Sequence, residues 1–306
     1  MTLRLVFIGE CMVEIAPDGA QYRKGFAGDT FNMAWYACHL APATWQVDFV
    51  SAIGTDAISD EMAGFIAAQS IGTGHLFRKP DRSVGLYMIS LKDGERSFSY
   101  WRSQSAARLL AEDPAALARA LAGADLACFS GITLAILDDH GRNTLAAALH
   151  DLRKAGGRTA FDPNIRPRLW ANPSDMRDTI TRFAGLSDVV LASFDDEAGQ
   201  FGDADAQATV ARYLAAGAGG VIVKNGPNPV IAVLGGAEVG VPTPPVGKIT
   251  DSTAAGDSFN AAFLVSHLSG APLAQAIAAG TALAGQVIQY PGALSRQAVD
   301  AVRAKG

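Results

Sequence analysis

The sequence has 306 residues, of which 49% are hydrophobic and 18% are charged, with a formal net charge of -5 at pH 7. This size and balance are typical of a soluble globular protein with a large core, and they exclude disordered and fibrous classes. The acidic balance argues against a nucleic acid or an anionic membrane as partner, because either would need a basic face. Any phosphate that this chain binds must therefore be held by a local site.

Strand and helix patterns alternate along most of the chain. Solid apolar runs predict strands at residues 3–8, 47–53, 126–130, 158–161, 188–192, 220–224 and 230–234. Amphipathic periodicity predicts helices at residues 31–40, 56–70, 114–122, 138–155, 173–184, 205–216, 254–268 and 273–288. This order favours an α/β fold with a largely parallel central sheet covered by helices on both faces. Ligands of such sheets collect beyond the carboxyl ends of the strands.

Two segments break this alternation. Residues 10–26 are short polar pieces punctuated by Pro17, Gly19 and Gly25, which is typical of a hairpin. Residues 83–102 hold two strand-like runs around the turn Asp93-Gly94-Glu95, which predicts a second hairpin. We expect the two hairpins to form a small, mostly antiparallel sheet inserted into the main fold.

The cysteines and the apolar runs of the sequence indicate where in the cell the protein is expected. The three cysteines, Cys11, Cys38 and Cys128, are odd in number and lack metal-ligand spacing, which favours reduced thiols and a cytoplasmic protein. The first apolar run is too short for a signal peptide, and the apolar stretch at 272–288 is interrupted by polar residues. We therefore expect no membrane association.

The stretch from Asp251 to Asp257 (DSTAAGD) places small residues between two carboxylates, where the helix expected at 254–268 begins. Unpaired amides and the helix dipole make such a helix N-terminus a site for an anion. A carboxylate there would repel a resting phosphate, so the presence of Asp257 needs a reason. It is explained if Asp257 takes the proton of a substrate hydroxyl while the amides hold a phosphoryl group. The alternative is an N-capping aspartate in a turn rich in alanine and glycine.

This stretch resembles the D-T-x-x-A-G-D signature of the ribokinase or PfkB family of carbohydrate kinases, with Ser252 in place of the usual threonine. Other segments resemble one branch of that family, the 2-keto-3-deoxygluconate kinases. These segments begin at Gly9 (GECMVE), Gly28 (GDTFN), Gly94 (GERSF), Tyr100 (YWR), Ser130 (SGI), Phe161 (FDPNIRPRLW) and Val223 (VKNG). The resemblance covers nearly the whole chain and implies a single ribokinase-like domain over 1–306, with lid segments at about 10–27 and 83–104.

The resemblance also implies an activity. It is the transfer of the γ-phosphate of ATP, with Mg²⁺, to the 6-hydroxyl of 2-keto-3-deoxy-D-gluconate, which gives 2-keto-3-deoxy-6-phosphogluconate. Asp257 would be the base, and the backbone of Ala254, Ala255 and Gly256 would stabilise the phosphoryl group. The lid would close over the substrates to exclude water and would supply the interface of a homo-oligomer. Activation by a monovalent cation stays open.

Two groups of residues are candidates for binding the sugar acid. Gly28, Asp29 and Asn32 would bind sugar hydroxyls, or would merely form a capped turn before a helix. A second group would bind the carboxylate, since a guanidinium grips that planar group with two charge-assisted bonds while a neutral sugar offers it no partner. Its members are Tyr87, Tyr100, Arg102 and Arg166. The alternative is that both arginines pair with surface carboxylates.

The nucleotide side is less well defined by sequence. By resemblance it includes Asn164, Arg166, Lys224, Gly226, Ala254 and Gly256. Lys224 could equally be a solvated lysine at a strand end. Glu197 ends a segment that occupies the place of the family's magnesium-linked N-x-x-E motif, but Phe194 replaces the asparagine. An indirect metal role for Glu197 therefore competes with a plain acidic helix start.

Two other functions fit the same sequence. The first is a different sugar kinase of this fold, of the fructokinase or ribokinase type. The second is a catalytically idle sugar sensor, because fold does not fix function. The arginines favour a sugar acid over a neutral sugar, and the intact DSTAAGD turn favours an enzyme over a sensor.

Overall fold

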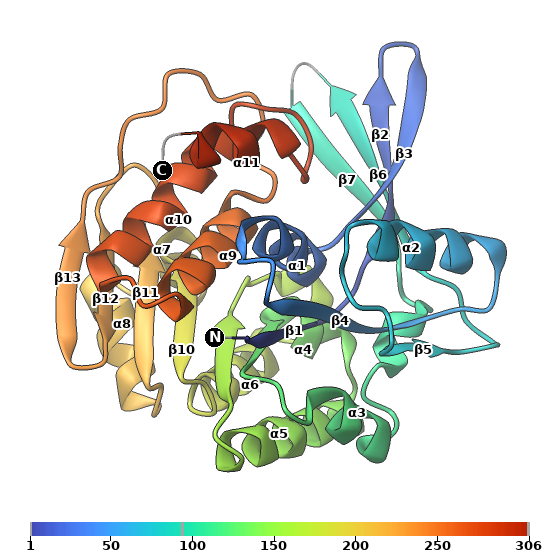
Figure 1. Cartoon of the computed structure of the whole chain (residues 1–306), viewed down its shortest axis with the longest axis horizontal. Coiled ribbons are helices and arrows are strands. Elements are labelled where there is room, and N and C mark those ends of the chain that lie inside the picture. The colour runs from blue at the N-terminus through green and yellow to red at the C-terminus, as the bar shows by residue number, and fades with distance from the viewer. Residues whose placement is uncertain (1, 93–94, 305–306) are drawn as a thin grey trace.

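The computed structural model describes residues 2–92 and 95–304, and within these residues two sheets organise the chain (Figure 1). The larger sheet has the strand order β13-β12-β11-β10-β9-β8-β1-β4-β5. Its strands are β1 (Arg4–Ile8), β4 (Gln46–Ile53), β5 (Leu76–Arg78), β8 (Leu126–Ser130), β9 (Arg158–Asp162), β10 (Val189–Ser193), β11 (Gly220–Lys224), β12 (Val230–Leu234) and β13 (Ala237–Val241). Every pair from β5 to β11 is parallel, and the two pairs at the β13 edge are antiparallel.

Both faces of this sheet are buried, as the solid apolar strands predict. Along β1, Leu5 and Phe7 join one hydrophobic cluster, whereas Val6 and Ile8 join the other. The first cluster is covered by α1 (Asp29–Leu40), α2 (Ala57–Ala68), α9 (Ala255–Leu268), α10 (Leu273–Val287) and α11 (Arg296–Arg303). The second is covered by α3 (Pro114–Leu121), α4 (Gly131–Ile136), α5 (Asp139–Lys154), α6 (Pro173–Ala184) and α8 (Ala206–Ala215).

Most of the expected elements are confirmed, with differences at short elements and at one helix start. Helix α1 begins at Asp29, two residues earlier than expected, so Asp29 is part of the helix. The short elements β5, β13, α4 and α11 were not expected, and α7 (Phe194–Phe201) was expected only as an acidic helix start, the alternative to a metal role for Glu197. Strand β12 runs antiparallel to β11, since the short connection between them cannot make a parallel crossover.

The smaller sheet has the order β3-β2-β6-β7, and we call it the lid sheet. Its strands are β2 (Met12–Asp18), β3 (Gln21–Ala27), β6 (Gly85–Lys92) and β7 (Glu95–Trp101). The two hairpins are antiparallel and join through a parallel β2–β6 pair, so the predicted insertion is confirmed. The predicted turn residues Asp93 and Gly94 lie outside the described residues. In Figure 1 the lid sheet rises at the upper right, beyond the end of α1.

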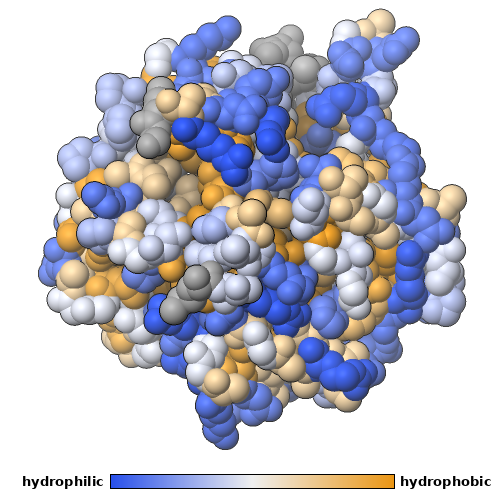
Figure 2. Space-filling view, in the orientation of Figure 1, coloured by the Kyte–Doolittle hydropathy of each residue, from blue (hydrophilic) through white to orange (hydrophobic). Residues whose placement is uncertain are grey.

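Among the residues that the structure describes, no helix has both the length and the apolar character needed to cross a bilayer. On the face drawn in Figure 2, hydrophilic and hydrophobic residues are interspersed over the helices and the lid sheet.

Candidate active site

The turn before α9 is held in an unusual backbone conformation. Ala254, the N-cap of α9, has φ 59° and ψ 16°, a left-handed conformation that costs a non-glycine residue about 1–2 kcal/mol. Ser258 donates its amide to Ala254 O at 2.9 Å and Ala255 donates its amide to Ser252 O at 3.2 Å, whereas the amides of Gly256 and Asp257 belong to the first turn, which lacks intrahelical acceptors. Backbone strain of this kind is typical of sites where the surroundings fix a functional geometry.

The two aspartates that frame the turn have different roles. Asp251 is buried and accepts bonds from the amides of Thr253 at 3.0 Å and Gly292 at 2.6 Å, so it anchors the turn to the loop after α10. Asp257 is the third residue of α9, and the N-cap makes no side-chain capping bond. The alternative interpretation of Asp257 as an N-capping residue is therefore wrong.

Asp257 instead faces the start of α1. Asn32 donates its Nδ2 to Asp257 Oδ2 at 2.7 Å. Desolvation raises the pKa of Asp257 well above its usual value, and the nearby carboxylates of Asp29 and Asp162 raise it further. The bond from Asn32 and the charge of Lys224 oppose that shift of the pKa. A carboxylate with a raised pKa is suited to accept a proton near neutral pH.

The start of α1 holds the predicted sugar-binding residues close together. A side chain on Gly28 would come within 2.1 Å of Glu10 O, so only glycine fits there. Asp29 is buried and accepts a bond from Asn164 Nδ2 at 2.8 Å. The structure thus brings Asp29, Asn32, Asn164 and Asp257 into one cluster.

Lys224 lies in the same region rather than in solvent. Its Nζ donates to Asn260 Oδ1 at 2.9 Å and lies 3.8 Å from Asp162 Oδ2. The alternative of a solvated lysine is therefore wrong. Sequence reasoning missed Asn260, which lies within α9 and carries no motif signal, and it included Asp162 only in the segment FDPNIRPRLW, without a role. Gly226 adopts a left-handed φ of 54° in the turn that follows β11.

Arg102 pairs with a buried carboxylate and not with a surface one. Its side chain is mostly buried, at the end of β7, and its Nη2 pairs with the buried carboxylate of Glu10. Burial raises the pKa of Glu10, and the charge of Arg102 opposes that rise. Oε1 of Glu10 and Nε of Arg102 are buried without a hydrogen-bond partner among the described residues. The alternative that Arg102 pairs with a surface carboxylate is therefore wrong, because its guanidinium pairs with Glu10 at the base of the lid sheet.

The remaining candidates for the carboxylate site lie around Arg102. Tyr87 is buried and donates its hydroxyl to Glu14 Oε2 at 2.5 Å. Tyr100 is 52% exposed, and its ring lies 5.9 Å from the ring of Tyr87. Arg166 is exposed and pairs with Asp196 Oδ2 at 3.3 Å. Of these four side chains, Tyr100 and Arg166 are the ones that reach solvent, while Tyr87 and Arg102 are tied within the protein.

Glu197 does not face solvent or the turn before α9. It is fully buried, and both its oxygens accept the hydroxyl of Tyr213 at 2.9 Å while Arg212 donates to Oε2 at 2.7 Å. Desolvation raises the pKa of Glu197 to about 7, and the charge of Arg212 opposes this shift. Because its acceptor sites are occupied by Arg212 and Tyr213, the structure corrects the expected metal role. Within the described residues, no group of three or more acidic, cysteine or histidine side chains could hold a metal ion.

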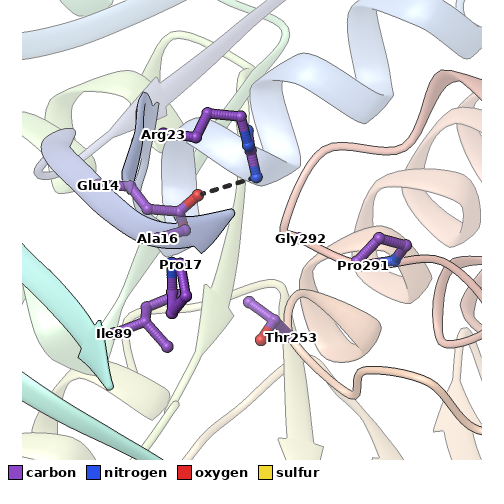
Figure 3. Close-up of a pocket in the computed structure, with 8 residues that line it drawn as sticks. All are labelled: Glu14, Ala16, Pro17, Arg23, Ile89, Thr253, Pro291 and Gly292. Atoms are coloured by element: carbon purple, nitrogen blue, oxygen red, sulfur yellow. Dashed lines mark ion pairs between the residues drawn. The ribbon is translucent and has the colours of Figure 1, made fainter. Parts of the chain in front are cut away.

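A small pocket separates the lid sheet from the turn before α9. It has a volume of about 60 Å³, well below the roughly 300–1,000 Å³ of typical ligand pockets. Figure 3 shows Glu14, Arg23 and Ile89 on the lid strands across from Thr253 and the loop at 291–292. The lid sheet therefore faces the turn directly.

Comparisons with known proteins agree with this geometry. Residues 2–298 match the family model of pfkB family carbohydrate kinases. The chain belongs to this family. It is 37% identical over 301 residues to the 2-dehydro-3-deoxygluconokinase of Escherichia coli (strain K12), which covers 96% of this chain and 97% of the relative.

Solved structures of this family share the fold. The PfkB protein from Polaromonas sp. JS666 matches with a TM-score of 0.82 and 26% identity over 98% of this chain and 99% of the other. A putative ribokinase II from E. coli, solved with ATP and Mg²⁺, matches with a TM-score of 0.83 and 20% identity over the full length of both chains. The fold is thus the expected ribokinase-like α/β fold with a small second sheet, and the chain is a carbohydrate kinase.

Proposed function

We propose that this kinase transfers the γ-phosphate of ATP to the 6-hydroxyl of 2-keto-3-deoxy-D-gluconate. The observation that carries the proposal is the position of Asp257, a carboxylate with a raised pKa in the first turn of α9. The Escherichia coli relative that is 37% identical is named 2-dehydro-3-deoxygluconokinase. 2-Dehydro-3-deoxygluconate is another name for 2-keto-3-deoxygluconate, so this relative supports the same substrate.

In the proposed step, Asp257 takes the proton of the 6-hydroxyl as its oxygen attacks the γ-phosphorus. A bond forms between that oxygen and phosphorus, the bond from phosphorus to the bridging oxygen of ATP breaks, and ADP leaves. The amides of Ala254, Gly256 and Asp257 would face the charge on the transferring group, and the amide of Ala255, which donates to Ser252 O at 3.2 Å, would hold the shape of the turn. Asn32 keeps the carboxylate of Asp257 oriented through its 2.7 Å bond.

The sugar acid would lie between the start of α1 and the lid sheet. Gly28, Asp29 and Asn32 would bind its hydroxyls, and Asp29 is kept in place by Asn164. Arg102 and Arg166, with Tyr87 and Tyr100, would bind the carboxylate end. Arg102 stands at the base of the lid sheet and Arg166 near the start of α7, so the acid would be gripped from two sides.

ATP would lie beyond the carboxyl ends of β9 and β11, near Asn164, Lys224 and Gly226. Mg²⁺ typically keeps several waters and is carried by nucleotide phosphates rather than by a protein cage. The ion would offset the negative charge of the phosphates, and no residue of this chain is assigned to it.

The lid sheet would close toward the turn before α9 and expel water, which suppresses hydrolysis of ATP. Its outer strand exposes Phe98, Tyr100 and Trp101, the last by 59%. Aromatic side chains of this kind are enriched at protein interfaces, which supports a homo-oligomer assembled through the lid sheet. The free thiols of all three cysteines agree with a cytoplasmic location.

A coupled assay of ADP release tests the proposal. The wild type should release ADP with 2-keto-3-deoxygluconate at a kcat/KM at least about 10²-fold above that with fructose or ribose, the discrimination expected from desolvated charge-assisted bonds. Equal rates with fructose or ribose would favour a different sugar kinase. Sugar binding without ADP release would favour the sensor.

A further inference from the structure

Lys224, the last residue of β11, lies along one face of α9. Gly256 and Asn260 are four residues apart and therefore share that face. Lys224 Nζ bonds to Asn260 and lies 3.7 Å from the position that a side chain on Gly256 would take. The ammonium group thus stands beside the first helical turn, whose amides are proposed to hold the phosphoryl group.

Asn260 connects this lysine to a buried carboxylate. Its Nδ2 donates to Asp162 Oδ2 at 2.7 Å, and its Oδ1 accepts from Lys224 at 2.9 Å. The reversed amide would place its NH₂ group against the ammonium and its oxygen against the carboxylate, so the two partners fix its orientation. Asn260 and Asp162 are both buried, which makes this bridge a fixed part of the core.

The lysine retains capacity for a ligand. Its side chain is only 14% exposed. In the part of the chain that the structure describes, Asn260 is the one hydrogen-bond acceptor of its Nζ, although an ammonium group has three donors. Asp162 compensates the charge from 3.8 Å without a hydrogen bond. A mostly buried cation with unused donors, next to a helix N-terminus, is suited to an incoming phosphate.

We propose that Lys224 donates a hydrogen bond to the transferring phosphoryl group, and that Asn260 and Asp162 are positioning residues that hold its ammonium beside the first turn of α9. This inference rests on the proposed function and adds a fixed cation to the backbone amides. A cation held in place in a dry site stabilises developing charge without having to reorganise. Asn260 acts through Lys224, because it bonds to the ammonium and to the carboxylate that balances it.

The same cation acts on the general base. Asp257 is faced by Asp29 and Asn32 from α1, by Asp162 from β9 and by Lys224 from β11. The two carboxylates raise the pKa of Asp257, whereas Lys224 lowers it. Loss of the cation should therefore raise that pKa further and move the acid limb of kcat/KM to higher pH.

Three variants test the inference by ADP release: Lys224→Met, Asn260→Leu and the double variant. We expect Lys224→Met to lower kcat by about 10²- to 10³-fold, and Asn260→Leu to lower it by about 10- to 10²-fold through misplacement of the ammonium. The double variant should match Lys224→Met within about twofold, as expected for residues that act as a unit. Both single variants should move the acid limb to higher pH.

Ser187→Ala is the matched control, since Ser187 is buried and its hydroxyl bonds only to Phe183 O at 2.8 Å among the described residues. It should lose stability without a change in kcat or in the acid limb. Asn260→Ser replaces Asn260→Leu if the latter does not fold.

Three results would overturn the inference. They are a kcat of Lys224→Met equal to that of the wild type, a loss of kcat in the double variant equal to the product of the two single losses, or an acid limb of kcat/KM that does not move in the single variants. An inactive wild type would instead contradict the proposed substrate, and the three variants would then be compared with the sugar that supports ADP release.

Discussion

The two sides of the proposed site are built differently. On the body side, Asn32 donates to Asp257 at 2.7 Å and Asn164 donates to Asp29 at 2.8 Å. On the lid side, Tyr100 is more than half exposed, and the guanidinium of Arg102 is engaged by Glu10. In the proposed mechanism, the groups around Asp257 are thus preorganised by the body, whereas the groups that would select the sugar acid would take their final positions as the lid sheet closes.

Substitutions on the two sides of the proposed site should change different kinetic constants. Changes to the groups bonded around Asp257 should lower kcat, because they remove interactions made in the transition state. Changes on the lid side should raise KM for the sugar acid and leave kcat nearly unchanged. A lid substitution that lowered kcat as strongly as a body substitution would break the distinction.

The largest effect is expected at Asp257. Asp257→Asn keeps a group that can accept the bond from Asn32 but removes the proton acceptor, so kcat should fall by about 10²- to 10⁴-fold with KM little changed. Steady-state ADP release measures both constants. Asp300→Asn, a matched exchange of an exposed aspartate on α11, should behave like the wild type. Turnover of Asp257→Asn close to that of the wild type would contradict the role of Asp257 as the base.

Arg102 should show the largest effect on the lid side. Arg102→Ala removes a charge-assisted bond to the substrate carboxylate, a loss of about 1.5–3 kcal/mol, which raises KM for the sugar acid by about 10- to 10²-fold. KM for a neutral sugar should change by less than about twofold.

A control separates this effect from loss of stability. Arg102→Ala leaves Glu10 buried without its cation, which costs about 3–5 kcal/mol. The double variant Glu10→Gln and Arg102→Met removes both charges and should recover most of that stability while the high KM remains. Equal changes in KM for acidic and neutral sugars would favour a kinase of neutral sugars.

Arg166 should show a smaller effect of the same kind. Its guanidinium is exposed and its pair with Asp196 is solvated, so Arg166→Ala should leave the melting temperature within about 2 °C of the wild type. KM for the sugar acid should rise by about three- to tenfold, as expected for one exposed charge-assisted bond. Arg168→Ala, at a neighbouring exposed arginine, is the control and should leave KM unchanged. An unchanged KM in Arg166→Ala would remove this residue from the carboxylate site.

The last prediction concerns stability, and its residue, Glu197, lies away from the site. Its substitution should leave the kinetic constants unchanged. Burial raises the pKa of Glu197 from 4.5 to about 7, so the folded state binds a proton more tightly than the unfolded state. Between these two pH values Glu197 lowers the free energy of unfolding as the pH rises, by at most about 1.4 kcal/mol per pH unit. Glu197→Gln should flatten the pH dependence of urea unfolding between pH 4.5 and 7. An unchanged slope would contradict this assignment.

The sequence predicts the scaffold and the turn that begins α9 well, for identifiable reasons. Solid apolar strands and periodic helices lead to the larger sheet, and the DSTAAGD turn locates Asp257 because small residues, a carboxylate and a helix start fall together. The hydrogen-bond and ion-pair partners of individual side chains could not be predicted in the same way. Nothing in the local sequence shows that Glu10 engages Arg102 from 92 positions away, or that Arg212 and Tyr213 occupy Glu197. Asn260 has no motif around it, and its role depends on two strands that only the fold brings to its helix.

The most direct test of the central claim is a crystal structure of this protein with 2-keto-3-deoxygluconate and a non-hydrolysable ATP analogue. The account predicts a carboxylate oxygen of Asp257 about 2.6–3.2 Å from the 6-hydroxyl, which is the reach of a general base, with the γ-phosphate at the first turn of α9. A carboxylate of Asp257 that points into solvent, with the 6-hydroxyl beyond hydrogen-bond reach in the closed complex, would contradict it.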